Sequence, residues 1–297
     1  MPHLKIGYFA DGPWSHQALT KLLSDNTIQI AFICARHDTP DPVLKAEAEK
    51  HGILFITHPD INSQSFLRHI GEYKCDLFVS MSFNQIFRTE SINLPTRKTI
   101  NCHAGKLPFY RGRNILNWAL INDEREFGIT VHFVDEGIDT GDIIMQRCYP
   151  ISDNDDYSTL LTRAYEGCAV NLYDAIKAIQ NDNVSRVPQV SIHRSGFYCS
   201  ARKAGDERLN WDQSSRDVFN FVRAICRPGP EARTWISDSE LKINRVEYLP
   251  DAPHYKGIPG AVVGLNNETF LVKTSDSYVR VAEWSASTRP RLGDRLS

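Results

Sequence analysis

The chain has 297 residues, of which 41% are hydrophobic and 24% are charged, as in globular proteins with a sizeable core. Its formal net charge of −2 argues against a general nucleic-acid binder, which usually has a basic surface. The amino terminus MPHLKIGYFA lacks the features of a signal peptide, and no apolar run reaches membrane-spanning length, so we expect a cytoplasmic protein without membrane contact. The seven cysteines include no CxxC pair, and we expect them to be reduced.

The first part of the chain alternates between short apolar runs and helical patterns. The apolar runs that predict buried strands lie at 4–10, 28–35, 53–58 and 75–82. The segments that predict helices between them lie after residue 13, over 42–52 and near 62–71. This rhythm predicts an α/β fold, namely a Rossmann-like domain with a mostly parallel sheet and helices on both faces.

The pattern changes toward the carboxyl end. Strands are predicted at 98–104, 127–134 and 142–151, and a long amphipathic helix over about 156–181. After a helix near 214–226, the chain has short strand-like pieces separated by Pro and Gly, namely LKINRVEYL, GAVVGL, TFLVKT and YVRVAEW. We therefore expect a catalytic domain over 1–200 and a small β-rich domain, OB- or barrel-like, over 201–297.

The stretch INCHAGKLPFYRGRN at 100–114 carries the first candidate chemistry. On a strand, the side chains of Asn101 and His103 point to the same side, here at the carboxyl end where open α/β sheets bind ligands. An Asn amide can donate to a carbonyl oxygen that gains negative charge, and a His can move a proton near neutral pH. The pair suits attack on an acyl carbon. A core His beside a capping Asn is the structural alternative.

The bend DEGIDTGD at 135–142 offers four carboxylates between two predicted strands. Asp139 stands between Gly137 and Gly141, residues that permit a tight backbone path. A carboxylate here could orient His103 and hold its charged form. An ordinary Gly/Asp hairpin is the alternative for this bend.

Five short motifs follow one another in this part of the sequence. They are NxH at 101–103, LPFYRG at 107–112, NW at 117–118, GITVH at 128–132 and DEGIDTGDI at 135–143. Their order resembles the formyltransferases that use 10-formyltetrahydrofolate, among them the methionyl-tRNA, glycinamide ribonucleotide and sugar-nucleotide enzymes. The stretch at 208–232 and the final GDRL are similar to the C-terminal domain of the tRNA and sugar enzymes.

The resemblance implies that Asn101, His103 and Asp139 form the catalytic triad of a formyl transfer that uses no metal. An amine would attack the formyl carbon of 10-formyltetrahydrofolate, His103 with Asp139 would manage the amine proton, and Asn101 would stabilise the oxyanion. The family's folate-facing loops correspond to two segments of this chain. Their residues are Ser82, Phe83, Asn84, Gln85, Ile86 and Phe87 in the first, and Phe133, Asp135, Glu136, Gly137 and Ile138 in the second.

The acceptor amine separates the branches of this family. The tRNA enzyme carries a basic insertion after its second strand, where this chain has the short, partly acidic ARHDTPDPVLKAEA at 35–48. The glycinamide ribonucleotide enzyme has a Gly-rich phosphate loop, where this chain has ADGPWSHQ at 10–17. The resemblance is therefore strongest to the enzymes that formylate nucleotide-linked 4-amino-4-deoxy or 4-amino-4,6-dideoxy sugars for surface glycans such as lipopolysaccharide and O-antigen.

Two other readings remain open at this point. Methionyl-tRNA formyl transfer is the alternative within the family. A non-catalytic folate- or nucleotide-binding module is the alternative outside it, and the intact triad argues against this reading. The resemblance also makes a homodimer built on the C-terminal domain an expectation, with a nucleotide-linked amino sugar as the ligand and no nucleic-acid partner.

The expected acceptor contacts come mainly from the loop after the triad strand. They are Trp14, Lys106, Phe109, Tyr110, Arg111, Gly112, Arg113 and Trp118. The three cationic side chains would face a pyrophosphate and the aromatic rings would pack on a sugar or base. Loop-stabilising contacts are the alternative for the arginines, and core packing is the alternative for the tryptophans. After NxH the chain has Ala104-Gly105-Lys106, where many relatives have Pro-Ser-Leu or Gly-Ser-Leu, so the sugar pocket should differ.

Overall fold

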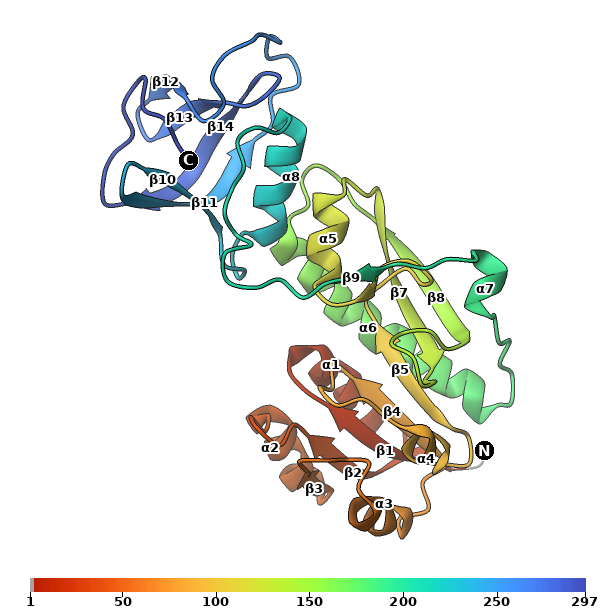
Figure 1. Ribbon diagram of the computed structural model, residues 1–297. Coiled ribbons are helices and arrows are strands. Elements are labelled where there is room, and N and C mark those ends of the chain that lie inside the picture. Colours follow the sequence, from red (N-terminus) through yellow and green to blue (C-terminus); the bar gives the residue numbers. More distant parts are fainter. Residues whose placement is uncertain (1–2) are drawn as a thin grey trace. The chain divides into compact units, whose positions relative to one another are not determined.

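The computed structural model describes residues 3–297, which form two compact units (Figure 1). Unit 1 contains the chain up to Gly112 together with Phe127–Tyr149 and Thr162–Cys199. Unit 2 contains Arg113–Glu126, Pro150–Leu161 and Ser200–Ser297. The last change of unit lies next to the boundary predicted near residue 200, but two earlier segments also belong to unit 2. The functional division into domains 1–200 and 201–297 therefore stays a prediction.

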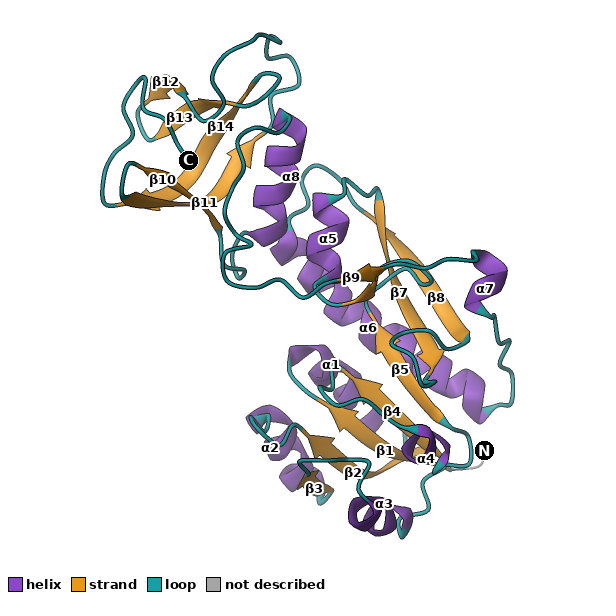
Figure 2. Cartoon of the chain, in the orientation of Figure 1, coloured by secondary structure: helices purple, strands orange, loops and turns teal. Residues whose placement is uncertain are grey.

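Unit 1 is built on a seven-stranded sheet with the order β3-β2-β1-β4-β5-β7-β8 (Figure 2). Its strands are β1 (Leu4–Ala10), β2 (Ile28–Ala35), β3 (Leu54–Thr57), β4 (Leu77–Met81), β5 (Thr99–His103), β7 (Glu126–Phe133) and β8 (Ile143–Pro150). The first five strands pair in parallel, and β7 runs antiparallel to β5. The mostly parallel sheet and the α/β class are thereby confirmed.

The helices of this part of the chain start and stop at local signals in the sequence. They are α1 (Pro13–Leu23), α2 (Pro42–His51), α3 (Gln64–Gly71), α4 (Thr89–Asn93), α6 (Tyr157–Gln180, mostly in unit 1) and α7 (Gln189–Ile192). The Asp41 carboxylate accepts from the N–H groups of Val43 and Leu44 and caps α2, and Gly52 ends that helix in a left-handed conformation. Two short strands, β6 (Arg111–Gly112) and β9 (Tyr198–Cys199), pair in parallel outside the main sheet.

An aromatic cluster underlies one end of the sheet in unit 1. Phe9 of β1 meets the rings of Phe32 and Phe78 edge-on, and all three are buried. Phe83 and Phe87 join the same cluster from the loop after β4, at 5.6 and 4.9 Å from the Phe9 ring centroid. Edge-to-face packing of this kind is favourable beyond simple burial. The loop at 82–87 is therefore anchored to the core by two of its own side chains.

Unit 2 consists of an antiparallel sheet and two helices. The helices are α5 (Ile115–Ile121) and α8 (Ser215–Ile225), and the strands are β10 (Ala232–Ile236), β11 (Ser239–Glu247), β12 (Val262–Asn266), β13 (Thr269–Lys273) and β14 (Tyr278–Ala286). The strand order is β10-β11-β14-β13-β12, and α8 packs on this sheet and on α5. A C-terminal antiparallel β domain is thereby confirmed.

The two edge strands of this sheet are joined by the segment at 295–297. The N–H and carbonyl groups of Trp235 in β10 exchange hydrogen bonds with Ser297, at 3.2 and 3.1 Å. The N–H of Leu296 donates to the Gly260 carbonyl just before β12, at 2.8 Å. Because one segment pairs with both ends of the sheet, the sheet closes on itself and has no open edge there.

Leu296→Ala is expected to lower the free energy of unfolding by about 2–5 kcal/mol, because this side chain is only 4% exposed at the closure of the sheet. Urea unfolding followed by circular dichroism measures the effect. Leu292→Ala is the matched control, since Leu292, shortly before the closing segment, is 67% exposed and its loss should change the stability little. Equal losses in both variants would contradict a structural role for the closure.

Candidate active site

The structure brings Asn101, His103 and Asp139 together in unit 1. The first two project from the end of β5, and Asp139 lies in the turn between β7 and β8. His103 Nδ1 lies 3.6 Å from Asp139 Oδ2, and Asn101 Nδ2 lies 3.5 Å from Asp139 Oδ1. The side chains of His103 and Asp139 are only 10% and 12% exposed. An amide donor, an imidazole and a carboxylate thus share one largely buried site, a set of groups that could serve acyl transfer.

The turn that carries Asp139 depends on its glycines. Asp139 has a φ of 54°, in the left-handed region that is unfavourable for most side chains. A Cβ at Gly141 would collide with the carbonyl oxygen of Phe133, and one at Gly137 would collide with the Thr140 hydroxyl. These close approaches explain why the bend needs glycine on both sides of the carboxylate.

Several groups hold the Asp139 carboxylate in its charged form. Burial by itself raises the pKa of this carboxyl. The charge of His103, a hydrogen bond and charge from His132, and the Gly112 N–H, which donates to Oδ2 at 2.9 Å, outweigh burial and hold the pKa well below its ordinary value. Gly112 thus holds the Asp139 carboxylate through its backbone, and its predicted contact with the acceptor stays a prediction.

His103 has an acceptor facing each ring nitrogen. Its Nε2 lies 2.7 Å from the backbone carbonyl of Tyr110, whose φ is 56°, and Nδ1 faces Asp139. Because a carbonyl only accepts, Nε2 must carry a proton. Only the charged ring can donate from both nitrogens, to the carbonyl and to the carboxylate. These two contacts hold the ring in place.

Gly105 explains part of the unusual Ala-Gly-Lys sequence after the NxH motif. A Cβ at Gly105 would collide with both His103 Nε2 and the Tyr110 carbonyl oxygen. The absence of a side chain at this position lets the loop close over the imidazole. The next residue, Lys106, packs its Cα and Cβ over Gly128 of β7.

Gly105→Ala is expected to lower turnover about 10–100-fold, because the new methyl group would separate His103 from the Tyr110 carbonyl and move the imidazole. Steady-state kinetics measures this effect. Gly71→Ala is the control, since a Cβ there would meet only the Leu94 side chain at an ordinary 3.8 Å. Unchanged turnover in Gly105→Ala would show that the carbonyl contact does not position His103.

His132 belongs to the site and was not predicted as a site residue. It lies directly across from Asn101 in the antiparallel pair of β5 and β7, and it is 2% exposed. Its Nδ1 donates to its neighbour, the Phe133 carbonyl, at 2.8 Å. Its Nε2 lies 3.2 Å from Asn101 Nδ2 and 3.5 Å from Asp139 Oδ1. In the neutral ring, this nitrogen can accept a hydrogen bond from the Asn101 amide. In the charged ring, it can donate one to the Asp139 carboxylate. His132 is the last residue of the GITVH motif. Its position opposite Asn101 on the neighbouring strand is the feature that could have identified it as a site residue.

The two segments predicted to face folate lie close to each other. Thr89, just after the first segment, donates a hydrogen bond to Glu136 in the second. Phe83 and Phe87 are anchored in the aromatic cluster, against which Val134 also packs. Each segment leaves one aliphatic side chain in the open, Ile86 at 62% and Ile138 at 50% exposure.

The remaining residues of these segments are fixed by local hydrogen bonds. Gln85 donates to the His58 carbonyl and accepts from the Ile61 N–H, while Asn84 lies 3.5 Å from Asp38. Asp135 accepts from the Gly137 N–H and from the Thr140 hydroxyl. Ser82 adopts a left-handed conformation with a φ of 56°. The segments therefore present Ile86 and Ile138 next to exposed polar side chains, among them Asn84, Asp135 and Glu136.

The predicted acceptor residues fall into separate groups. Phe109 and Tyr110 pack on Phe197, at 5.6 and 4.9 Å between ring centroids, and Arg111 donates to Gln189. Trp14 of α1 packs edge-on against Tyr165, at 4.7 Å, within the helix layer.

Arg113 and Trp118 belong to unit 2. Arg113 is exposed, and the Trp118 indole N–H donates to the Ser200 carbonyl with the Arg202 guanidinium over its ring. Of the predicted acceptor residues, Arg111 is linked through Gln189 to the turn at Asp139, and Gly112 contacts Asp139 directly.

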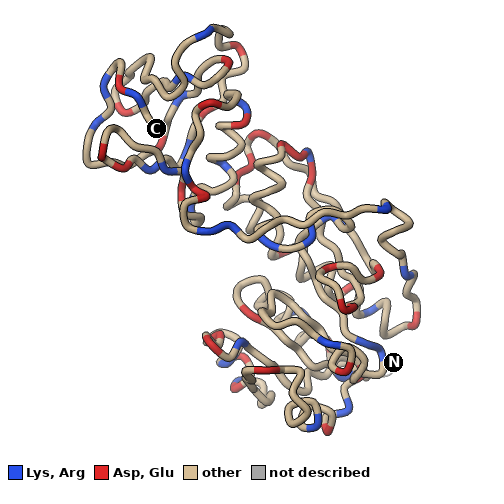
Figure 3. Tube along the Cα trace, viewed as in Figure 1, with Lys and Arg blue, Asp and Glu red and all other residues tan. Residues whose placement is uncertain are grey.

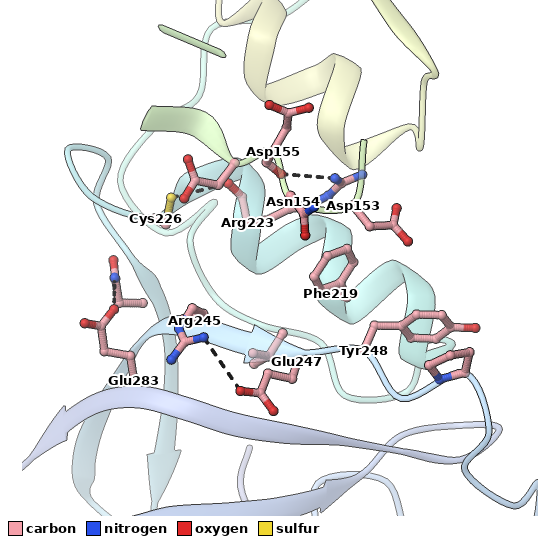
Figure 4. Close-up of a pocket in the computed structure, with 14 residues that line it drawn as sticks. Asp153, Asn154, Asp155, Phe219, Arg223, Cys226, Arg245, Glu247, Tyr248 and Glu283 are labelled. Carbon is pink, nitrogen blue, oxygen red and sulfur yellow. Dashed lines mark hydrogen bonds and ion pairs between the residues drawn. The ribbon is translucent and has the colours of Figure 1, made fainter. Parts of the chain in front are cut away.

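Unit 2 contains a separate cavity of about 520 Å³ between α8, β11 and the loop at 153–156 (Figure 4). Carboxylates and two arginines line it, together with the rings of Phe219 and Tyr248. None of the residues predicted from the sequence to be functional lines this cavity. Over residues 3–297, no group of three or more His, Cys, Asp or Glu side chains is arranged to hold a metal ion. Over the same residues, no helix is both long and apolar enough to cross a bilayer.

Comparisons with known proteins identify the family of this chain. The family model described as formyl transferase matches residues 5–175, and the one described as formyl transferase, C-terminal domain, matches residues 202–293. A methionyl-tRNA formyltransferase of Pelotomaculum thermopropionicum is 32% identical over 263 residues, which cover 88% of this chain and 82% of that protein.

Solved structures share the fold over nearly the whole chain. WlaRD, a sugar 3N-formyl transferase with dTDP and 5-N-formyl-THF, has a TM-score of 0.69 at 22% identity and covers 98% of this chain and 100% of that one. An N-formyltransferase from Helicobacter canadensis with folinic acid and dTDP-3-aminofucose has a TM-score of 0.68 at 20% identity and covers 96% and 100%. By its two matching domains and its sequence relatives, the chain belongs to the formyl transferase family.

Proposed function

We propose that the protein transfers the formyl group of 10-formyltetrahydrofolate to the amine of a nucleotide-linked amino sugar. The triad geometry supports an acyl transfer, and the family supplies the group that is transferred. An amino sugar is preferred over tRNA as the acceptor because of the loop after β2. This loop is short, and its only arginine is paired with carboxylates. A 4-amino-4-deoxy or 4-amino-4,6-dideoxy sugar stays the specific expectation for the acceptor.

The two segments at 82–87 and 133–139 fit a folate donor. A pterin is a flat ring with donors and acceptors along its edge, and these segments offer exposed aliphatic side chains beside backbone groups. Ile86 and Ile138 are large apolar side chains left exposed, one in each segment. Solved relatives of the same fold are described with 5-N-formyl-THF, folinic acid or tetrahydrofolic acid. These observations support the proposal that the donor binds at this surface.

The triad residues can divide the chemistry among them. The amine nitrogen of the acceptor forms a bond to the formyl carbon, and the bond from that carbon to the folate nitrogen breaks. His103 Nδ1 takes the proton released by the amine and returns one to the departing folate nitrogen, with Asp139 stabilising the charged ring. The Asn101 amide, oriented by His132, donates to the oxygen as it becomes negative.

The loop after β2 offers little to a nucleic-acid phosphate. Arg36 donates to both oxygens of Asp38, at 3.0 and 2.7 Å, and lies 3.5 Å from Asp11. Asp41, which accepts from the Gly12 N–H and pairs with His16, adds further negative charge. A guanidinium already held by two carboxylates contributes little to binding a phosphate backbone.

The charge of unit 2 points in the same direction. It contains seventeen Lys and Arg residues and nineteen Asp and Glu residues, a formal balance of −2. Figure 3 shows basic and acidic positions interspersed along this unit. RNA-binding domains instead gather basic residues on one face. A small phosphorylated ligand needs only one or two cationic contacts and fits this surface better.

Methionyl-tRNA formyl transfer is the second candidate, and one observation favours it. The sequence relatives, at 28–32% identity over most of the chain, are methionyl-tRNA formyltransferases. Formyl transfer to tRNA would then require a basic surface outside the loop after β2. The cellular setting remains part of the proposal: a cytoplasmic enzyme, dimeric through its C-terminal domain, whose product enters lipopolysaccharide or O-antigen synthesis.

A screen of acceptors tests the proposal. The purified protein is incubated with 10-formyltetrahydrofolate and with UDP-, dTDP- or GDP-linked 3-amino and 4-amino sugars, alongside initiator methionyl-tRNA. Mass spectrometry detects the gain of one formyl group. We expect transfer to an amino sugar and none to the tRNA. Transfer to the tRNA alone would overturn the proposed acceptor and show that the loop after β2 does not discriminate between them.

A further inference from the structure

A glutamine far from the triad in the sequence contacts the turn that carries Asp139. The Gln189 side chain is 4% exposed. Its Nε2 donates to the carbonyls of Asp139 and Gly141, at 2.8 and 2.9 Å. Its Oε1 accepts from Arg111, at 2.7 Å from Nη2 and 3.2 Å from Nε. One side chain therefore uses both of its N–H groups on the turn and both of its lone pairs on the guanidinium.

The orientation of this amide is fixed by its neighbours. A guanidinium only donates and a carbonyl only accepts, so exchanging the amide oxygen and nitrogen would break all four hydrogen bonds. The backbone before Gln189 is also fixed, because Val187 exchanges two hydrogen bonds with Ile143 at the start of β8. The side chain is thus held as a rigid link between two parts of the site.

A second hydrogen bond comes from the same segment. The Tyr198 hydroxyl donates to the Ile138 carbonyl, one residue before Asp139, at 2.8 Å. Asp139 has a positive φ, a conformation that persists only when its surroundings hold it. The segment at 187–199 therefore holds the carbonyls of both Ile138 and Asp139. The same segment presents the Gln189 side chain to Arg111.

We infer that Gln189 is a positioning residue that links Arg111 to the backbone of Asp139 and so sets the distance between the Asp139 carboxylate and His103. When an anionic acceptor draws on the Arg111 guanidinium, Gln189 transmits the change to the turn that carries the catalytic carboxylate. Its activity test rests on the proposed function, whereas its spectroscopic test needs no acceptor.

Two substitutions separate the two halves of this link. Gln189→Leu removes all four hydrogen bonds. Gln189→Glu keeps acceptors for Arg111 but sets carboxylate oxygens against the carbonyls of Asp139 and Gly141, so it breaks only the half that holds the turn. Gln180→Leu is the matched control, since Gln180 is a 2% exposed glutamine that bonds to Thr27 and Lys177 instead.

Turnover and KM for the folate donor are measured for all three variants. We expect Gln189→Leu and Gln189→Glu each to lower kcat about 10–100-fold with KM within about threefold of wild type, since a small displacement of a catalytic group has effects of this size. Gln180→Leu should keep its kcat even where its melting temperature falls. A wild-type kcat in Gln189→Glu would overturn the inference, and so would an equal loss in Gln180→Leu.

Carbon-13 NMR of the Asp139 carboxyl gives the second readout. In wild type this carboxyl should titrate below the ordinary range of an aspartate, and in Gln189→Leu it should titrate at higher pH, because the turn has moved away from His103 and Gly112. An unchanged titration would overturn the inference. If no amino sugar is formylated by the wild type, the proposed acceptor fails, but this titration still decides whether Gln189 positions Asp139.

Discussion

His103→Ala is expected to lower turnover by about 10²–10⁴-fold while folate binding persists. The imidazole is the group in the site that can carry a proton between the amine and the folate nitrogen, and its contacts to the Tyr110 carbonyl and Asp139 fix its position. The proposed folate site consists of other residues, those of the segments at 82–87 and 133–139, so the affinity for the donor should change little. Single-turnover kinetics and isothermal titration with the folate separate the two effects.

His69→Ala provides the control for this prediction. His69 lies exposed on α3, with its ring 5.8 Å from Tyr73, and its loss should leave turnover unchanged. Near-wild-type turnover in His103→Ala would mean that another group moves the proton. Loss of folate binding would mean that the ring belongs to the donor site instead.

Asp139→Asn is expected to lower turnover about 10²-fold or more, because it removes the negative charge that faces the His103 ring. The side chain keeps nearly the same size, so the effect reports the charge. The folded-state pKa of Asp139 lies below its ordinary value, so the ionised carboxylate stabilises the fold. That stabilisation is fully present above the ordinary carboxyl pKa and is lost as the pH falls toward the folded-state pKa.

The stability difference between wild type and Asp139→Asn should therefore depend on pH. It is expected to be constant from pH 7 to about pH 5 and to shrink below about pH 4, because the unfolded chain binds a proton at this carboxyl at a higher pH than the folded protein does. Urea unfolding at pH 7, 5 and 3.5 measures it. A difference that grows as the pH falls would mean that the folded protein raises this pKa.

Much of the fold can be predicted from the apolar runs in the sequence. LKIGYFA and IQIAFICA predict β1 and β2 with their observed bounds, because buried parallel strands are continuous apolar segments. The Asn101–His103 pair could be placed on one face of a strand from its spacing alone. Asp139 was connected to this pair through the family resemblance, since the sequence does not say which of the four carboxylates in the bend faces the imidazole.

The features that the sequence did not predict involve backbone groups or distant partners. The Tyr110 carbonyl holds His103, but a carbonyl carries no side-chain signal. Gln189 reaches Asp139 across fifty residues of chain, without a periodic pattern. The closure of the sheet in unit 2 rests on three residues, too few to show the alternation of a strand. The segments at 113–126 and 150–161 join unit 2 through tertiary packing, which local propensity does not report.

The Tyr110 carbonyl occupies Nε2 of the His103 ring, so Nδ1, which also faces Asp139, is the nitrogen left to exchange protons. In the proposed reaction, the incoming amine and the departing folate nitrogen must then both reach the Nδ1 side of the ring, in turn. The two substrates would therefore lie along the same edge of the imidazole, with the formyl carbon between them. This geometry limits the faces from which an acceptor can enter, so a bulky amine that approaches from the Nε2 side would bind without reacting.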